Sequence, residues 1–348
     1  MINKNFWKNK KILITGHTGF KGRWLTIILK VLDSKVFGIS LDEKYNFEKK
    51  EYINFLKKKN CFFLDIRKRK KIEKVILKIN PEIIIHMAAK SKVIDGYYNP
   101  VETFETNFMG TVNILNASVK LKKLKTILVV TTDKVYENNE KKKKFSENDK
   151  LGGDDPYSTS KASAEIILNY YRKFNPRIKI ISVRAGNIIG GGDFGKDRII
   201  PDLVKAWKTK KKLIIRNPRS IRPWQYVLDV LISYIRIIEL SYKLKNINSS
   251  FNIGPFLTDL NVIELVSKIK NHFNNLKLII KKNKLILEKE YLNLDIKRSV
   301  KLLGLKNNIS LNERIERTAN LYKQILNSKN INHMEQIYKK EILNFLSK

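Results

Sequence analysis

The chain has 348 residues and a net charge of +37, and its one cysteine, Cys61, excludes an internal disulfide and favours a reducing compartment. It contains neither the apolar core of a secretory signal nor a run approaching the roughly 18 apolar residues of a membrane span, so we expect a cytoplasmic protein with no membrane partner. Its lysines are scattered through predicted helices, which indicates compositional bias rather than a nucleic-acid partner, with a polyanion-binding scaffold as the alternative.

The first half of the chain alternates between strand and helix patterns. Short aliphatic runs predict buried strands at Lys11–Thr15, Val36–Ile39, Cys61–Leu64, Ile83–His86 and Thr126–Thr131. Apolar residues at helical spacing predict helices at Phe20–Leu32, Lys70–Ile79 and Val101–Lys120. Because strands that alternate with helices form parallel sheets, we predict an α/β fold with a Rossmann-type, doubly wound parallel sheet.

Three glycines, Gly16, Gly19 and Gly22, lie between the first strand and the first helix in the sequence KKILITGHTGFKGRW. Their GxxGxxG spacing between a strand and a helix is typical of a dinucleotide-binding loop. Glycine lets the backbone approach a pyrophosphate closely, and the helix N-terminus supplies amide donors and the positive end of the helix dipole. We therefore predict that this loop binds a dinucleotide rather than serving only as a tight turn.

Acidic residues follow the next two predicted strands. Asp42 comes after the second strand, where a carboxylate accepts hydrogen bonds from an adenosine ribose, and this favours NAD over its phosphorylated relative. Arg23 and Lys44 lie nearby in the sequence and keep that choice open. Asp65 follows the third strand and is placed to accept a hydrogen bond from the adenine amine.

A second motif places a phenol beside an amine. Tyr157 and Lys161, in DPYSTSKASAE, are four residues apart and share one face of a predicted helix. A tyrosine is a poor base at neutral pH because its usual pKa is about 10, but a neighbouring ammonium and a positive nicotinamide stabilise the phenolate. At the end of the fifth strand, where parallel sheets bind ligands, Thr132 can bond the reacting hydroxyl, and Asp133 and Lys134 can transfer protons.

These motifs combine with HMAAK, TNFMGTVNIL, VRAGNIIGGGDF, DRIIPDLVKAW, IRNPRSIRPWQYVLDVL and FNIGP. Together they make the chain resemble the extended short-chain dehydrogenase/reductase family from Lys11 to about Tyr322. GHTGFKG, TTDK and RPWQYV are similar to the branch of 4,6-dehydratases that acts on CDP-glucose. The resemblance implies NAD as the cofactor, bound by Gly16, Gly19, Phe20, Lys21, Gly22, Asp42, Asp65, Ile66, Ala88, Thr106, Tyr157 and Lys161.

The resemblance also implies a hydro-lyase reaction that closes on itself. Tyr157 would take the proton from the C4 hydroxyl while a hydride passes from C4 to NAD, and the 4-ketone would acidify C5. Asp133 would protonate the departing C6 hydroxyl, Lys134 would act near C5, and the hydride would return to C6. The product would be CDP-4-dehydro-6-deoxyglucose, a precursor of deoxysugars in surface polysaccharides such as lipopolysaccharide O-antigen.

The second half of the chain is expected to bind the sugar nucleotide. The resemblance implies four substrate-binding residues, namely Asn187, Arg198, Arg216 and Arg222. Guanidinium groups suit a diphosphate because their forked donors match its oxygens, whereas the alternative for Arg216 and Arg222 is an exposed arginine in a basic protein. Trp224 is expected to pack in the interior rather than to stack on a base.

We expect two lobes followed by a tail. An NAD-binding Rossmann lobe comprises residues 1–186 and 226–254, and a smaller C-terminal sugar-nucleotide lobe comprises residues 187–225 and 255–330. Within the tail, residues 331–348, six apolar residues at helical spacing predict a docked helix, namely Ile331, Met334, Ile337, Tyr338, Ile342 and Phe345. The resemblance further implies a homodimer or homotetramer that associates through helices at Val101–Lys120 and Tyr157–Phe174.

Several residues are assigned plainer roles. The four histidines and the cysteine show no metal-ligand spacing, so we predict no metal, and His86 is expected to be packed or hydrogen-bonded. Lys90 departs from the glutamine that the resembled family often has there.

The competing function is a 4-epimerase or a dehydratase of dTDP-glucose, GDP-mannose or a UDP-sugar. Asp133 and Lys134 favour a dehydratase because a simple epimerase performs no elimination.

Overall fold

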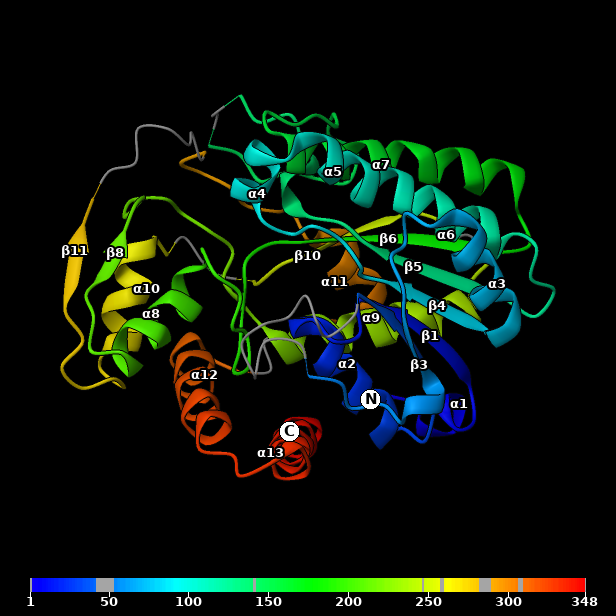
Figure 1. Cartoon of the computed structure of the whole chain (residues 1–348). Helices are drawn as coiled ribbons and strands as arrows, with labels where there is room; N and C mark the ends of the chain where they lie inside the picture. The colour runs from blue at the N-terminus through cyan, green and yellow to red at the C-terminus, as the bar shows by residue number, and fades with distance from the viewer. Residues whose placement is uncertain are drawn as a thin grey trace.

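The computed structural model describes residues 2–41, 53–139, 142–245, 247–256, 260–281, 289–305 and 309–347. These residues form a seven-stranded parallel sheet with the strand order β10-β6-β5-β4-β1-β2-β3 (Figure 1). Its strands are β1 (Lys11–Thr15), β2 (Lys35–Ser40), β3 (Cys61–Phe63), β4 (Ile83–His86), β5 (Thr126–Val130), β6 (Lys179–Ala185) and β10 (Ser250–Ile253). The strand order reverses at β1, which pairs with both β2 and β4, so the predicted doubly wound sheet is confirmed.

Helices cover both faces of this sheet. One face carries α3 (Arg69–Ile79), α6 (Gly110–Ser118) and α7 (Pro156–Phe174), and the other carries α2 (Phe20–Val31) and α9 (Val227–Ser241) (Figure 1). Because both faces are covered, a strand such as β4, with the sequence IIIH, is buried along its whole length. That explains why its sequence is continuously apolar up to His86 instead of alternating.

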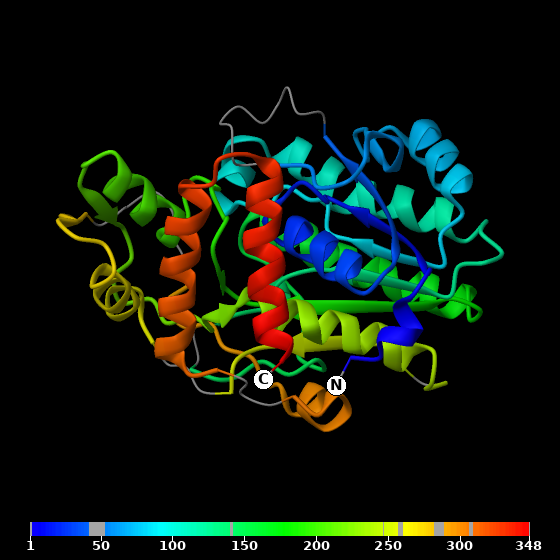
Figure 2. The same ribbon diagram turned by 90° about the horizontal axis from the view of Figure 1, so that it is seen from below.

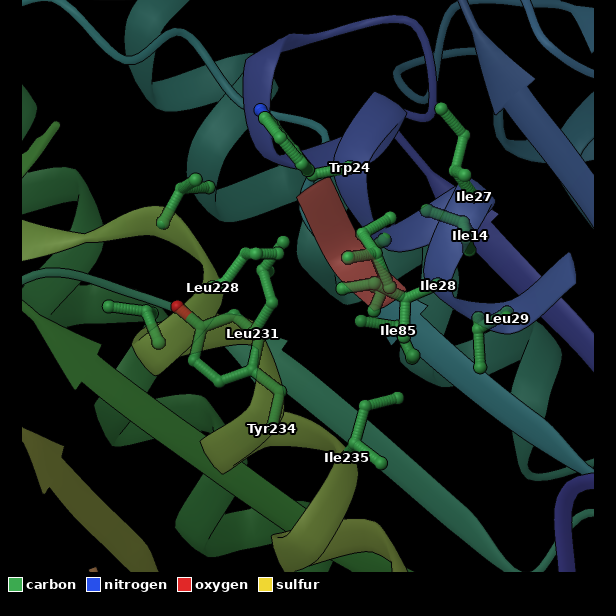
Figure 3. Close-up of a cluster of buried hydrophobic side chains, with 14 of the residues drawn as sticks. Ile14, Trp24, Ile27, Ile28, Leu29, Ile85, Leu228, Leu231, Tyr234 and Ile235 are labelled. Carbon is green, nitrogen blue, oxygen red and sulfur yellow. The ribbon is translucent and has the colours of Figure 1, made fainter. Parts of the chain in front are cut away.

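The larger hydrophobic core lies between the sheet and the pair α2 and α9. Figure 3 shows Trp24 and Ile28 of α2 and Leu231 of α9 gathered around Ile14 of β1 and Ile85 of β4. Burying an aliphatic side chain of this size contributes about 1.5–3 kcal/mol relative to leaving it exposed. This core fixes α2 against the sheet and therefore fixes the loop that precedes α2.

A smaller lobe is built largely from the second half of the chain (Figure 1). It contains the strand pairs β8 (Leu213–Ile215) with β11 (Leu278–Ile280) and β7 (Ile188–Ile189) with β9 (Gln225–Tyr226), and the helices α8 (Ile199–Lys208), α10 (Val262–Lys270) and α12 (Leu311–Leu326). Trp224 is buried in its core, and the indole N–H donates to the carbonyl of Leu260 at 3.0 Å. The packing role predicted for Trp224 is confirmed, and the lobe boundaries stay a prediction.

One predicted helix differs in its internal geometry. The range Val101–Lys120 contains α5 (Pro100–Phe104), a π-helical turn η3 (Glu105–Met109) and α6 instead of one regular α-helix. Asn107 in the π-helical turn is buried and bonds to Lys90 and Ser160. Apolar spacing alone does not reveal such a turn, because π-helical bonds shift the helix by a single residue.

The remaining elements are short or lie near the chain ends. They are α1 (Lys4–Trp7), the turn η2 (Lys58–Asn60), α4 (Val93–Tyr98), the turn η4 (Asp133–Val135), α11 (Lys297–Leu303) and α13 (Ile331–Leu346). The helix α4 was not predicted from the sequence. Within the part of the chain that is described, no helix combines the length and the apolar composition needed to cross a membrane.

The C-terminal helix α13 packs against α2 and runs beside α12 (Figure 2). Five of its predicted apolar residues are buried, namely Met334, Ile337, Tyr338, Ile342 and Phe345. Ile331, at the first position of the helix, is 53% exposed and does not belong to the buried face. The prediction of a docked helix is therefore confirmed, with Ile331 as the exception.

Candidate active site

A cavity of about 350 Å³ lies where the carboxyl ends of the strands meet the smaller lobe, the edge where open parallel sheets bind ligands. Residues that we assigned to catalysis line it, namely Thr132, Asp133, Lys134 and Tyr157. All four predicted substrate residues line it as well, namely Asn187, Arg198, Arg216 and Arg222. The fold therefore brings together side chains that are far apart in the chain, and we call this cavity the active-site cavity.

The glycine loop is closed so tightly that side chains would not fit. Gly16 has φ 77°, and a Cβ atom there would lie 2.9 Å from the backbone nitrogen of Ala88. A Cβ atom at Gly22 would lie 2.1 Å from the Gly16 carbonyl oxygen. Gly19 is the N-cap of α2 and has no side chain to cap the first amides of the helix. These residues fit a dinucleotide, because a helix N-terminus without a side-chain cap presents amide donors to a pyrophosphate.

The other residues assigned to the cofactor have partners of their own within the fold. Asp42 lies outside the described residues. The Asp65 carboxylate accepts hydrogen bonds from the backbone N–H of Arg67 at 2.9 Å and from its guanidinium at 2.6 Å. The Ile66 carbonyl accepts one from Asn113, and the backbone N–H of Ala88 donates to the Thr15 hydroxyl. Thr106 is half-buried in η3. The roles of all these residues stay predictions.

Tyr157 and Lys161 occupy successive turns of α7, as their spacing predicts. This helix begins with Asp155 as its N-cap, whose side chain accepts from the backbone of Ser158, and with a proline in its first turn. Burial raises the pKa of Tyr157 to about 12, against the lowering effect of a hydrogen bond with Thr132. The protein's own residues therefore leave the phenol protonated at neutral pH.

The side chain of Lys161 reaches from α7 to the central sheet. Its Nζ donates to the backbone carbonyl of Val130 at 3.1 Å, so within the described residues it bonds to strand β5 and not to the phenol. Burial lowers the pKa of Lys161 to about 8, and the charge of Glu165 opposes that shift. The buried amine stays close to its titration point near neutral pH.

The turn after β5 presents an acid next to an amine. Asp133 is almost fully buried, and its Oδ1 accepts a hydrogen bond from the Thr132 hydroxyl at 3.0 Å. Among the described residues its Oδ2 has no hydrogen-bond partner. Burial raises the pKa of Asp133, opposed first by the charge of Lys134. A carboxyl group that holds its proton more strongly is suited to donate it to a leaving group.

Guanidinium groups line the smaller-lobe side of the active-site cavity. Arg198 pairs with both carboxylate oxygens of Asp193 at 2.9 and 3.0 Å, and also donates to the Ser91 hydroxyl at 2.7 Å. Arg216 pairs with Asp197 at 3.2 Å. Arg222 is only 4% exposed, so the alternative of a surface arginine is wrong for this residue.

Two residues in this cavity were not anticipated in these positions. Lys21, which we assigned to the cofactor alone, also lines the active-site cavity. Its pKa is lowered to about 7, mainly by burial and next by the positive charges of Lys161 and Arg198. The negative charges of Asp133 and Asp193 oppose this shift. Asp193 belongs to the motif VRAGNIIGGGDF, and the sequence assigned it no role of its own. No local signal in the sequence predicts its ion pair with Arg198.

The two histidines nearest the sheet have structural partners. His86 bonds through Nδ1 to Thr15 at 2.6 Å and through Nε2 to Thr111 at 3.1 Å, which confirms a hydrogen-bonded role. Burial, followed by the charge of Lys161, lowers the pKa of His86 to about 3. His17 in the glycine loop bonds to Ser40 at 2.9 Å and to Cys61 at 3.1 Å. In the portion of the chain described, no group of three potential ligands could hold a metal ion.

The model of the NAD dependent epimerase/dehydratase family matches residues 12–254. The chain belongs to this family, a class of enzymes that uses NAD, as predicted. CDP-glucose 4,6-dehydratase of Salmonella typhimurium is 40% identical to it over 76% of this chain and 77% of the relative. An epimerase from Methanothermobacter thermautotrophicus superposes with a TM-score of 0.82 at 21% identity, covering 93% of this chain and 95% of that one. A dTDP-glucose 4,6-dehydratase from Bacillus anthracis, in complex with NAD, has a TM-score of 0.74 at 22% identity, covering 94% and 99%.

Proposed function

We propose that this protein is a hydro-lyase that converts CDP-glucose to CDP-4-dehydro-6-deoxyglucose. The observation that carries the proposal is the convergence of a phenol, a carboxyl group and an amine, those of Tyr157, Asp133 and Lys134, on one cavity beside the glycine loop. The similarity to the Salmonella typhimurium CDP-glucose 4,6-dehydratase supports CDP-glucose as the substrate. The product would serve deoxysugar synthesis for surface polysaccharides such as O-antigen.

The first chemical step depends on the phenol. The glycine loop, Gly16–Gly22, would hold the dinucleotide at the N-terminus of α2, and bound NAD supplies a hydride acceptor that later returns the hydride. Tyr157 would accept the proton of the C4 hydroxyl, and Thr132, which bonds to the phenol, would orient that hydroxyl. Because burial raises the pKa of Tyr157 to about 12, the phenol needs additional positive charge before it can act as a base.

Elimination of water requires a second acid–base pair. Asp133 has the buried carboxyl group whose raised pKa suits a proton donor, and we assign it to the departing C6 hydroxyl. Lys134 follows Asp133 in the same turn and lines the same cavity, so we assign it to the C5 proton. A 4-epimerase needs neither group, which is why this pair favours a dehydratase over that alternative.

The arginines are assigned to the diphosphate of the sugar nucleotide. Arg198, Arg216 and Arg222 line the same cavity with Asn187, and guanidinium groups bind phosphate oxygens with two parallel hydrogen bonds. Their excess of positive charge over Asp193 and Asp197 suits a ligand that carries two negative charges. We propose no nucleic-acid and no membrane partner.

We also propose a homodimer or a homotetramer in the cytoplasm. Large apolar side chains are exposed along α4, α5, η3 and α7, namely Tyr97, Tyr98, Val101, Met109, Ile166, Tyr170 and Phe174. An apolar patch of this kind on a globular protein often marks a protein–protein contact. This observation supports association through the two helices that the sequence predicts.

A substrate panel tests the proposed activity. The purified protein would be incubated separately with CDP-glucose, dTDP-glucose, UDP-glucose and GDP-mannose, and each mixture assayed for a 4-keto-6-deoxy sugar. We expect product with CDP-glucose at a kcat/KM well above that of the other three. Product from another nucleotide would move the assignment to that dehydratase, and a 4-epimer without a keto sugar would establish the epimerase alternative.

A further inference from the structure

The turn at Gly190–Asp193, here called the GGGD turn, joins the active-site cavity to the C-terminal helix α13. Gly192 has φ 89°, a backbone conformation that favours glycine. A Cβ atom at Gly192 would lie 1.9 Å from the Tyr338 hydroxyl oxygen, and one at Gly191 would lie 2.3 Å from the Leu321 Cβ atom. The turn is thus pressed against α12 and α13 with no space for side chains.

Hydrogen bonds from α2 and α12 hold the GGGD turn, and α13 packs beside it. From α2, the Arg23 guanidinium donates to the Gly192 carbonyl, and the Trp24 indole N–H donates to the Gly191 carbonyl at 3.0 Å. From α12, the Tyr322 hydroxyl donates to the Asp193 carbonyl at 2.6 Å. The Tyr338 ring from α13 packs on the Trp24 ring with their centroids 4.3 Å apart.

The GGGD turn ends at the residue that orients an arginine of the active-site cavity. The Asp193 carboxylate is nearly buried and accepts two hydrogen bonds from Arg198, at 2.9 and 3.0 Å. Arg198 is the N-cap of α8 and lines the same cavity as Tyr157. A shift of the turn would therefore move the carboxylate and, with it, the guanidinium group.

We propose that Tyr338 is a positioning residue for sugar-nucleotide binding, acting through the GGGD turn and Asp193 on Arg198. This proposal rests on the proposed function only in taking Arg198 as a substrate contact. Tyr338 belongs to a helix beyond residues 12–254, the segment that matches the family model. The tail thereby gains a specific role besides covering apolar surface.

The contact made by Tyr338 is steric. The ring is fully buried, and among the described residues its hydroxyl has no hydrogen-bond partner. Burial raises the pKa of the Tyr338 phenol. The Tyr338 hydroxyl oxygen is the side-chain atom nearest to Gly192, and the ring lies behind it. Loss of the hydroxyl should therefore have part of the effect, and loss of the whole side chain should have all of it.

Three single variants first test the proposal through KM and kcat for CDP-glucose, bound nicotinamide per protomer, and Tm. We expect Tyr338→Ala to raise KM about ten-fold while kcat stays within about two-fold and the nicotinamide content is unchanged. Tyr338→Phe, which removes only the hydroxyl, should raise KM less than Tyr338→Ala does. Phe345→Ala is the matched control, because Phe345 is buried in the same helix but packs on Tyr226, with ring centroids 5.9 Å apart. It should lower Tm to a similar extent and leave KM unchanged.

Arg198→Ala and the double variant Tyr338→Ala/Arg198→Ala distinguish an error in the role of Tyr338 from an error in the substrate role of Arg198. If Tyr338 acts through Arg198, the double variant has the KM of Arg198→Ala alone, because coupled residues are not additive. Additive effects, an unchanged KM in Tyr338→Ala, or an equal rise in Phe345→Ala would overturn the proposal. An unchanged KM in Arg198→Ala would instead refute the substrate role of Arg198. If Tyr338→Ala does not fold, Tyr338→Leu, which keeps an apolar side chain there, must show the KM rise.

Discussion

At the scale of single residues, burial moves the titration of the active-site groups in opposite directions. It raises the pKa of Tyr157 to about 12 and lowers those of Lys161 and Lys21 to about 8 and about 7. One cause explains both directions, because burial disfavours whichever form is charged. The phenol is thus made a weaker acid while the two amines come close to losing their protons at physiological pH.

Lys134 distinguishes a dehydratase from an epimerase. Lys134→Ala should still oxidise C4 of CDP-glucose but stall before water leaves, because the C5 proton has lost its acceptor. We expect the overall rate to fall by about 10²–10⁴-fold, with accumulated absorbance of reduced nicotinamide and slower C5 proton exchange with solvent. Lys150→Ala, at an exposed lysine paired with Glu137, is the control and should match the parent. Turnover of Lys134→Ala at the parent rate would remove this residue from the mechanism.

Lys21 should make NAD binding depend on pH. Its side chain faces Lys161 of α7, Arg198 before α8, Asp133 of η4 and Asp193 of the GGGD turn. A dinucleotide pyrophosphate favours the charged ammonium, so binding raises its pKa above the value of about 7 in the free protein. Affinity should therefore be highest below pH 7 and fall as the pH rises to 8.

Calorimetric titration of NAD into cofactor-stripped protein at pH 6, 7 and 8 measures this dependence. Lys21→Met should bind more weakly at pH 6 and lose most of the change between pH 6 and 8. Lys21→Arg, which keeps its charge at pH 8, should retain affinity there. The same pH dependence in the parent and Lys21→Met would show that another group is responsible.

At the scale of elements, the π-helical turn η3 and the GGGD turn are the irregular segments that serve the site. The π-helical turn brings Asn107 of one helix to Lys90 after β4 and to Ser160 of α7, the helix that carries Tyr157 and Lys161. Its amide makes hydrogen bonds of 2.8, 3.0 and 3.0 Å with these partners. In a regular α-helix the Asn107 side chain would point in a different direction from the helix axis.

Replacement of Asn107 tests the stability that this turn provides. Asn107→Ala leaves partly buried backbone groups of Lys90 without partners, so we expect the free energy of unfolding to fall by about 1–3 kcal/mol. Urea denaturation followed by circular dichroism measures the change. Asn169→Ala, at an exposed asparagine of α7, is the control and should stay within about 0.5 kcal/mol of the parent. A loss below about 1 kcal/mol in Asn107→Ala would contradict the structural role.

At the scale of the whole molecule, the exposed apolar face of α4, α5, η3 and α7 predicts the assembly state. Ile166 and Phe174, both on α7, are 60% and 67% exposed. Ile166→Glu combined with Phe174→Glu places two charges on this face, so we expect the dimer or tetramer to dissociate to monomers at micromolar concentration. Light scattering coupled to size exclusion measures the mass.

Ile331→Glu is the matched control for this prediction, because Ile331 is equally apolar and 53% exposed but belongs to α13. It should leave the assembly unchanged. A parent protein that is already monomeric, or dissociation caused equally by Ile331→Glu, would contradict association through α7.

Much of the architecture follows from local patterns in the sequence. Runs such as KILIT and IIIH predicted their strands to the residue, because a strand covered on both faces is continuously apolar. The glycine loop was also evident, since its spacing and its strand–helix context are local. Thr132, Asp133 and Lys134 could be placed at the active-site cavity because parallel strands bring their carboxyl ends to one edge of the sheet.

Other features were decided only when distant segments packed together. The Lys161 ammonium bonds to Val130 of β5, and Lys21 lies among the charges of four residues that are distant in the chain. Neither the partners nor the pKa of Lys21 can be predicted from the residues next to it in the sequence. The same holds for the pairing of Asp193 with Arg198 and for Tyr338, whose link to Arg198 passes through Gly192 and Asp193 of the GGGD turn. Sequence periodicity therefore determined the sheet and the location of the site, whereas burial and long-range contact decided its electrostatics and the orientation of its arginine.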